Sequence, residues 1–65
     1  MNGAELVRAF ERSGWMRLRQ TGSHVRMERA GEHVTIPLHK PLARGTLSAL
    51  LDAAGMTADD LRRVL

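Results

Sequence analysis

The side chains most able to do chemistry in this sequence lie in one short stretch, where Gly22, Ser23 and His24 follow one another. The imidazole of a histidine has an ordinary pKa of about 6.5, so it can accept or release a proton near neutral pH. A glycine can adopt the positive φ angle that a tight turn requires. Arginines stand on both sides of this stretch, at Arg17, Arg19, Arg26 and Arg29. The pattern predicts a histidine at the mouth of a strand, within a field of positive charge.

Metal binding and serine chemistry are the first alternatives for these residues. His24, His33 and His39 are nine and six residues apart, unlike the short ligand spacings of zinc motifs, and the chain has no cysteine. We therefore expect neither a metal nor another cofactor. Ser23 beside His24 suggests a hydroxyl nucleophile with its base, but adjacent strand residues point to opposite faces. We expect Ser23 to shape the turn or to donate to a phosphate.

A histidine without a metal can still act on a phosphodiester. Positioned acid–base catalysis typically contributes about 10²–10⁴-fold. In the absence of metal-bound hydroxide, the easiest nucleophile is the 2′-hydroxyl of the substrate itself, which restricts the chemistry to RNA. Positive side chains would hold the phosphates and stabilise the charge that develops. The other interpretation is that His24 only caps a hairpin on an exposed sheet face, and the residues alone leave both open.

Positive charge is concentrated in the middle of the chain. The net charge is +3, and residues 12–46 hold seven of the ten Lys and Arg but two of the seven Asp and Glu. This is the distribution expected of a polyanion binder, although a solvated basic surface would look the same. His39 and Lys40 precede a predicted helix whose first amides could bind an anion with help from Arg44 and Thr46. An ordinary junction between loop and helix explains these four residues equally well.

The length and composition indicate one small domain, residues 1–65. A chain of this size buries only about 60% of its unfolded surface, which leaves no room for a deep cofactor cavity. The absence of cysteine suits a reducing cytosol. The sequence lacks the long apolar run of a signal peptide or a membrane span. We therefore expect a soluble, cytoplasmic protein that has no contact with membranes.

The pattern of apolar residues and turn residues predicts an α+β fold. Asn2 and Glu5 form a capping box at the start of the first helix, and Gly14 ends that helix. Thr21-Gly22 is the expected hairpin turn. Helices are expected at residues 3–13, 43–54 and 58–64, and antiparallel strands at residues 15–20, 24–30 and 33–38.

The alternation within the strands predicts which face the helices cover. Val25 and Met27 lie on one face, whereas His24 and Arg26 lie on the other. The simplest packing places all helices on the apolar face and leaves the polar face open. The other large apolar side chains that we expect to pack are Trp15, Met16, Val34, Ile36 and Leu38.

Several short motifs together resemble the HicA family of toxin ribonucleases from bacterial toxin–antitoxin systems. The resemblance extends over nearly the whole chain and rests on residues 14–15, 19–24, 36–39, 45–47 and 54–55. The resemblance implies a double-stranded-RNA-binding-domain-like α-β-β-β-α fold and metal-independent cleavage of messenger RNA, with His24 as the catalytic residue. It also implies a HicB-type antitoxin that covers the active site, and contact with operator DNA only through that antitoxin. The connector at residues 39–44 holds fewer lysines than is usual in the family.

The residues and the resemblance together predict one site. His24 is the expected general acid or base, and water, Lys40 or His39 would serve the second proton transfer. The residues expected to contact RNA are Arg17, Arg19, Ser23, Arg26, His39, Lys40, Arg44 and Thr46. Two other functions compete with this one: a non-catalytic RNA-binding module of the same fold, and an interaction protein whose basic face meets only an acidic protein.

Overall fold

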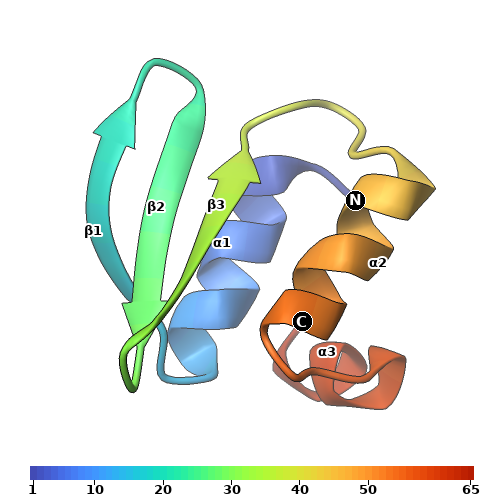
Figure 1. Ribbon diagram of the computed structural model, residues 1–65. Helices are drawn as coiled ribbons and strands as arrows, with labels where there is room; N and C mark the ends of the chain where they lie inside the picture. The colour runs from blue at the N-terminus through green and yellow to red at the C-terminus, as the bar shows by residue number, and fades with distance from the viewer.

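A computed structural model describes all residues, 1–65, and confirms the α+β class and the order of the elements (Figure 1). The helix α1 is followed by three antiparallel strands and by two more helices, as in the double-stranded-RNA-binding-domain layout with a short third helix. The elements are α1 (Gly3–Arg12), β1 (Met16–Thr21), β2 (His24–Arg29), β3 (Glu32–Pro37), α2 (Arg44–Ala53) and α3 (Ala58–Val64). No helix of the chain has the length and apolar character needed to cross a membrane.

The sheet has the strand order β1-β2-β3 and carries the helices on one face (Figure 1). Fourteen buried apolar side chains form a single core, to which β1 contributes none. From the sheet, Val25, Met27, Val34 and Ile36 point into this core. Alternation therefore sends the neighbouring side chains of β2 and β3 to the opposite side, which no helix covers. We call this side the open face.

The predicted packing of Trp15 and Met27 is confirmed, but that of Met16 is wrong. Trp15 and Met27 are buried, and the Trp15 ring lies 5.6 Å from that of Phe10. Met16 is 68% exposed because it pairs with Glu28, a residue of the open face. Alternation along β1 alone could not reveal this, since it does not say which partner each residue meets.

Both hairpin turns have two central residues. In the first, Thr21 lies opposite His24 and the turn is Gly22-Ser23, one residue later than expected. Gly22 has a φ of 58°, as the first position of a type II′ turn requires. In the second turn, Ala30 and Gly31 both have positive φ, 51° and 82°, which is the type I′ pattern. Ala30 adopts this conformation at an energetic cost that glycine or asparagine would largely avoid.

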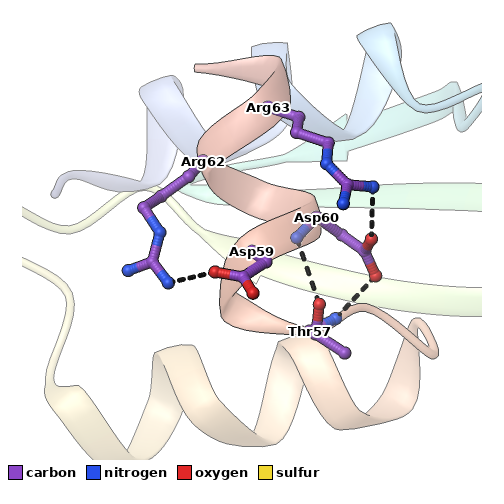
Figure 2. Close-up of polar contacts among 5 residues, drawn as sticks. All are labelled: Thr57, Asp59, Asp60, Arg62 and Arg63. Carbon is purple, nitrogen blue, oxygen red and sulfur yellow. Dashed lines mark hydrogen bonds and ion pairs between the residues drawn. The ribbon is translucent and has the colours of Figure 1, made fainter.

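Capping boxes start the first and the third helix. The amide of Glu5 donates to Oδ1 of Asn2 at 2.8 Å, and the amide of Asn2 donates to Oε1 of Glu5 at 3.0 Å, as predicted. Figure 2 shows the same reciprocal pair between Thr57 and Asp60 at α3. The amide hydrogen bond from Thr57 is the main cause that lowers the pKa of the Asp60 carboxyl from 3.8.

Candidate active site

His24 lies at the start of β2, directly after the turn, with its side chain exposed on the open face. Its neighbour Val25 is buried, so the pleat directs the imidazole away from the core. Thr21 of β1 and Pro37 of β3 are its cross-strand partners. The histidine therefore stands at the end of the central strand, accessible from solvent and flanked by both other strands.

A second histidine meets the first. His39 lies in the connector between β3 and α2, and the centroids of the two rings are 6.4 Å apart, with their planes at 71°. Both side chains are exposed. Fourteen residues lie between them in the chain, so no spacing rule could pair them, and only the meeting of β2 with the end of β3 does so. Two imidazoles at one place can handle two protons of one reaction.

Backbone hydrogen bonds hold the connector on both sides of His39. The amide of Leu38 donates to the carbonyl of Ser23 at 2.7 Å, which ties the connector to the first turn. The amide of Gly3 donates to the carbonyl of His39 at 3.0 Å, and the amide of Leu42 donates to the carbonyl of Met1 at 2.9 Å. The position of His39 thus depends on the start of α1 and on the turn that carries His24.

Gly3 is a positioning residue that the sequence analysis missed. A Cβ atom at this position would lie 2.0 Å from the carbonyl oxygen of Pro37 and 2.8 Å from the Cα atom of Leu38. Only glycine therefore lets the first turn of α1 approach the end of β3 this closely. The available signal was a glycine in the first turn of a helix, where alanine would be the better helix former.

A β-bulge places the two arginines of β1 on opposite faces of the sheet. The register shifts between Arg17 and Arg19, so that Arg19 lies opposite Arg26 on the open face. Arg17 lies opposite the buried Met27 and approaches Glu11 of α1, with 3.7 Å between Nη2 and Oε1. The structure therefore brings Arg19 and Arg26 to the face of His24 but places Arg17 on the other side of the sheet.

The remaining predicted contacts surround the connector. Ser23 is exposed in the turn, Lys40 is exposed beside His39, and Arg44 is the exposed first residue of α2. Thr46 follows in the first turn of α2 and is half-buried. Ala43 provides no side-chain cap, so the first amides of α2 have no side-chain acceptor.

Four cations of the predicted site have no carboxylate partner. The four ion pairs of the chain join Arg17 to Glu11, His33 to Glu28, Arg62 to Asp59 and Arg63 to Asp60. None of them involves Arg19, Arg26, Lys40 or Arg44. The pairs on α3, seen in Figure 2, neutralise the arginines at the far end of the molecule. The positive charge of these four side chains is thus uncompensated by any carboxylate of the chain.

The site is a surface and not a pocket. A groove of about 360 Å³ lies between α2 and α3, and one of about 280 Å³ lies beside Arg29 and Arg63. Neither hollow is lined by His24 or His39. Small-molecule ligands usually bind in enclosed, largely apolar clefts, so the open arrangement favours a polymer that lies across it. No group of three or more His, Cys, Asp or Glu side chains is arranged to hold a metal ion.

Comparison with protein families identifies a toxin family. The family model of the HicA toxin of bacterial toxin–antitoxin systems matches residues 3–56. The matched range runs from the first residue of α1 to Met56 and includes His24, His39 and α2, whereas α3 lies outside it. No curated protein gives a significant match.

Proposed function

This chain belongs to the HicA family of bacterial toxins, and we propose that it is an endoribonuclease that uses His24 and His39 as its proton-transfer pair. The family supplies the toxin role and the existence of an antitoxin partner. The cleavage of messenger RNA without a metal is our proposal. The observation that supports it best is the 6.4 Å approach of the two rings on an open surface, beside cations that lack carboxylate partners.

The proposed reaction transfers two protons. One imidazole, in its neutral form, takes the proton of a 2′-hydroxyl, whose oxygen attacks the adjacent phosphorus. The bond from phosphorus to the 5′-oxygen breaks, and the other imidazole, in its protonated form, gives that oxygen a proton. The products are a 2′,3′-cyclic phosphate and a free 5′-hydroxyl. Each positioned proton transfer contributes about 10²–10⁴-fold, and nearby guanidinium groups stabilise the charge on the phosphorane.

Cleavage of RNA by the purified chain in EDTA tests this function. We expect wild type to cut a single-stranded RNA, and His24→Ala and His39→Ala each to lower the rate by at least about 100-fold. His33→Ala is the matched control, because His33 stands on the same face but pairs with Glu28 at the far end. Its rate should equal that of wild type. A 2′-deoxy nucleotide at the cut site should abolish cleavage there.

Three results would contradict the proposal. Intact RNA after incubation with folded wild type would remove the ribonuclease function. Equal cleavage by His24→Ala would remove His24 from the chemistry, and equal cleavage by His39→Ala would leave the second transfer to water or Lys40. His39 is held through its backbone carbonyl, so its side chain can be removed without loosening the connector. Circular dichroism checks that each variant is folded.

The free cations of the open face also favour a second candidate, an RNA-binding module without catalysis. Such a module would bind RNA with an affinity that falls linearly with salt on a log–log scale, and would leave the RNA uncut. An interaction protein that meets only an acidic partner would bind no RNA even at low salt. The two measurements together separate the three functions.

The antitoxin partner is proposed to be of the HicB type. By covering His24 and His39 it would exclude messenger RNA, and contact with operator DNA would come only through the antitoxin. Because messenger RNA is translated in the cytoplasm, we expect the toxin to act there.

A further inference from the structure

We infer that the substrate, a short single-stranded segment of RNA, lies along the open face of the sheet. One phosphate of this segment binds between Arg19 and Arg26 and anchors it. The inference rests on the proposed ribonuclease function and adds the position of the RNA strand next to the cleaved bond. It also limits how much of the RNA the protein contacts.

The opposition of Arg19 and Arg26 is the first argument. Directly opposed side chains of an antiparallel pair lie about 5 Å apart at Cβ, and like charges there destabilise the sheet. No carboxylate pairs with either guanidinium. The bulge between Arg17 and Arg19 creates this arrangement, because regular pairing would place Leu18 opposite Arg26. A phosphate between the two guanidiniums turns the repulsion into two charge-assisted contacts.

The distance to His24 is the second argument. His24 and Arg26 alternate with the buried Val25 on β2, so their Cα atoms are about 7 Å apart along the strand. A phosphate held by Arg26 and Arg19 thus stands next to the phosphate that His24 and His39 would act on. The anchor therefore belongs to a neighbouring nucleotide of the same strand.

The far end of the open face sets the length. Glu28 follows Arg26 on the same face and pairs with His33. Its carboxylate lies about 13 Å from His24 along the strand and repels further phosphates. The positive part of the face thus accommodates about two phosphates of an extended strand.

The chemistry proposed for the site favours a single strand. The large aromatic residues, Phe10 and Trp15, are buried and do not reach this face. Met16, on the same face, offers an exposed apolar surface instead. In-line attack by the 2′-hydroxyl requires a flexible backbone, and single strands present splayed nucleotides that a duplex does not.

Binding to fully 2′-O-methylated RNA tests the path independently of cleavage, because such RNA has no 2′-hydroxyl. We expect fluorescence anisotropy to show that Arg19→Gln and Arg26→Gln each weaken binding on the order of tenfold and lower the salt slope by about one. Arg8→Gln is the matched control. It removes the same charge from an exposed position of α1, on the other side of the sheet, and should change the affinity by less than about twofold.

Length and strandedness complete the experiment. The affinity for wild type should stop rising at about three nucleotides, the length that carries two bridging phosphates, and Glu28→Gln should extend that rise to longer oligonucleotides, because removing the carboxylate removes the repulsion. A 2′-O-methyl duplex should bind more weakly than a single strand of equal length.

The outcomes separate this inference from the proposed function. If wild type cleaves RNA but Arg19→Gln and Arg26→Gln bind it as wild type does, the inferred RNA path is wrong and the proposed ribonuclease function is retained. If wild type binds through these arginines but never cleaves, the path stands and the ribonuclease falls. Tighter binding of the duplex overturns the single-strand inference. If both variants lose affinity only for the antitoxin, the face belongs to that protein and the path is wrong.

Discussion

At the scale of single residues, the site depends on a few close approaches between distant parts of the chain. His24 and His39 meet because β2 pairs with the end of β3 and because the connector is tied to Gly3, Ser23 and Met1. Neither histidine is buried. Backbone hydrogen bonds, rather than a tight pocket, therefore hold the two residues close together. Gly3 is the position of this group that tolerates an added side chain least.

Gly3→Ala should destabilise the protein although alanine is the better helix former. Its Cβ atom would collide with the carbonyl of Pro37, and relieving such overpacking costs about 1–3 kcal/mol. Because the amide of Gly3 holds His39, cleavage should slow as well. Gly45→Ala is the matched control, since Gly45 also lies in the first turn of a helix but has no atom within 4 Å of the added Cβ. It should gain about 0.5–1 kcal/mol. Urea unfolding measures both, and equal effects would contradict the steric argument.

At the scale of the elements, the strands and the turns contribute differently to the core and to the site. β2 and β3 supply the sheet's share of the core, whereas all six residues of β1 are exposed. β1 therefore contributes pairing and charge but no buried side chain, and its bulge decides which arginine reaches the open face. The turn at Gly22-Ser23 carries the site, and the turn at Ala30-Gly31 lies at the opposite end of β2.

Ala30→Asn should stabilise the protein without changing cleavage. Ala30 has a φ of 51° in the first position of a type I′ turn, where Asn-Gly is strongly preferred. Removing the strain should raise the free energy of unfolding by about 1 kcal/mol. The same change at Ala49, an exposed helical position of α2, should lower it by about 0.5 kcal/mol. Thermal unfolding distinguishes the two signs, and a loss of stability in Ala30→Asn would show that the turn is not strained.

At the scale of the whole molecule, charge is separated between two regions. The helix α3 pairs its own arginines with its own aspartates (Figure 2), whereas the cations near His24 and His39 stay free. The small core leaves one side of the sheet without a covering layer (Figure 1). A thin, one-sided domain with an uncovered basic face is suited to contact a polyanion that is larger than itself.

Expression of the chain in bacteria without an antitoxin should stop growth. Cleavage of messenger RNA would arrest translation, so His24→Ala should restore growth and His33→Ala should remain toxic. Growth curves after induction measure the effect, with soluble protein confirmed by immunoblot. Normal growth with abundant soluble wild type would count against the toxin acting through RNA.

The local features of this protein follow from residues that are close together in the sequence. The capping residues, the turn glycines and the alternation of β2 and β3 depend on neighbours in the chain, and each predicted boundary of a helix or strand lies within one residue of the observed one. The same local motifs carried the resemblance to the HicA family, which the family match confirms. His24 was predicted as a site residue in this way because its turn and its basic neighbours are contiguous with it.

The contacts between residues that are distant in the sequence depend on the three-dimensional fold. The pairing of His24 with His39, the separation of Arg17 from Arg19 and the exposure of Met16 all follow from register and from one bulge. A register is set by contacts across the sheet, and one extra residue reverses the face of every side chain beyond it. The fit of Gly3 against Pro37 likewise depends on how α1 packs against β3, which no local pattern records.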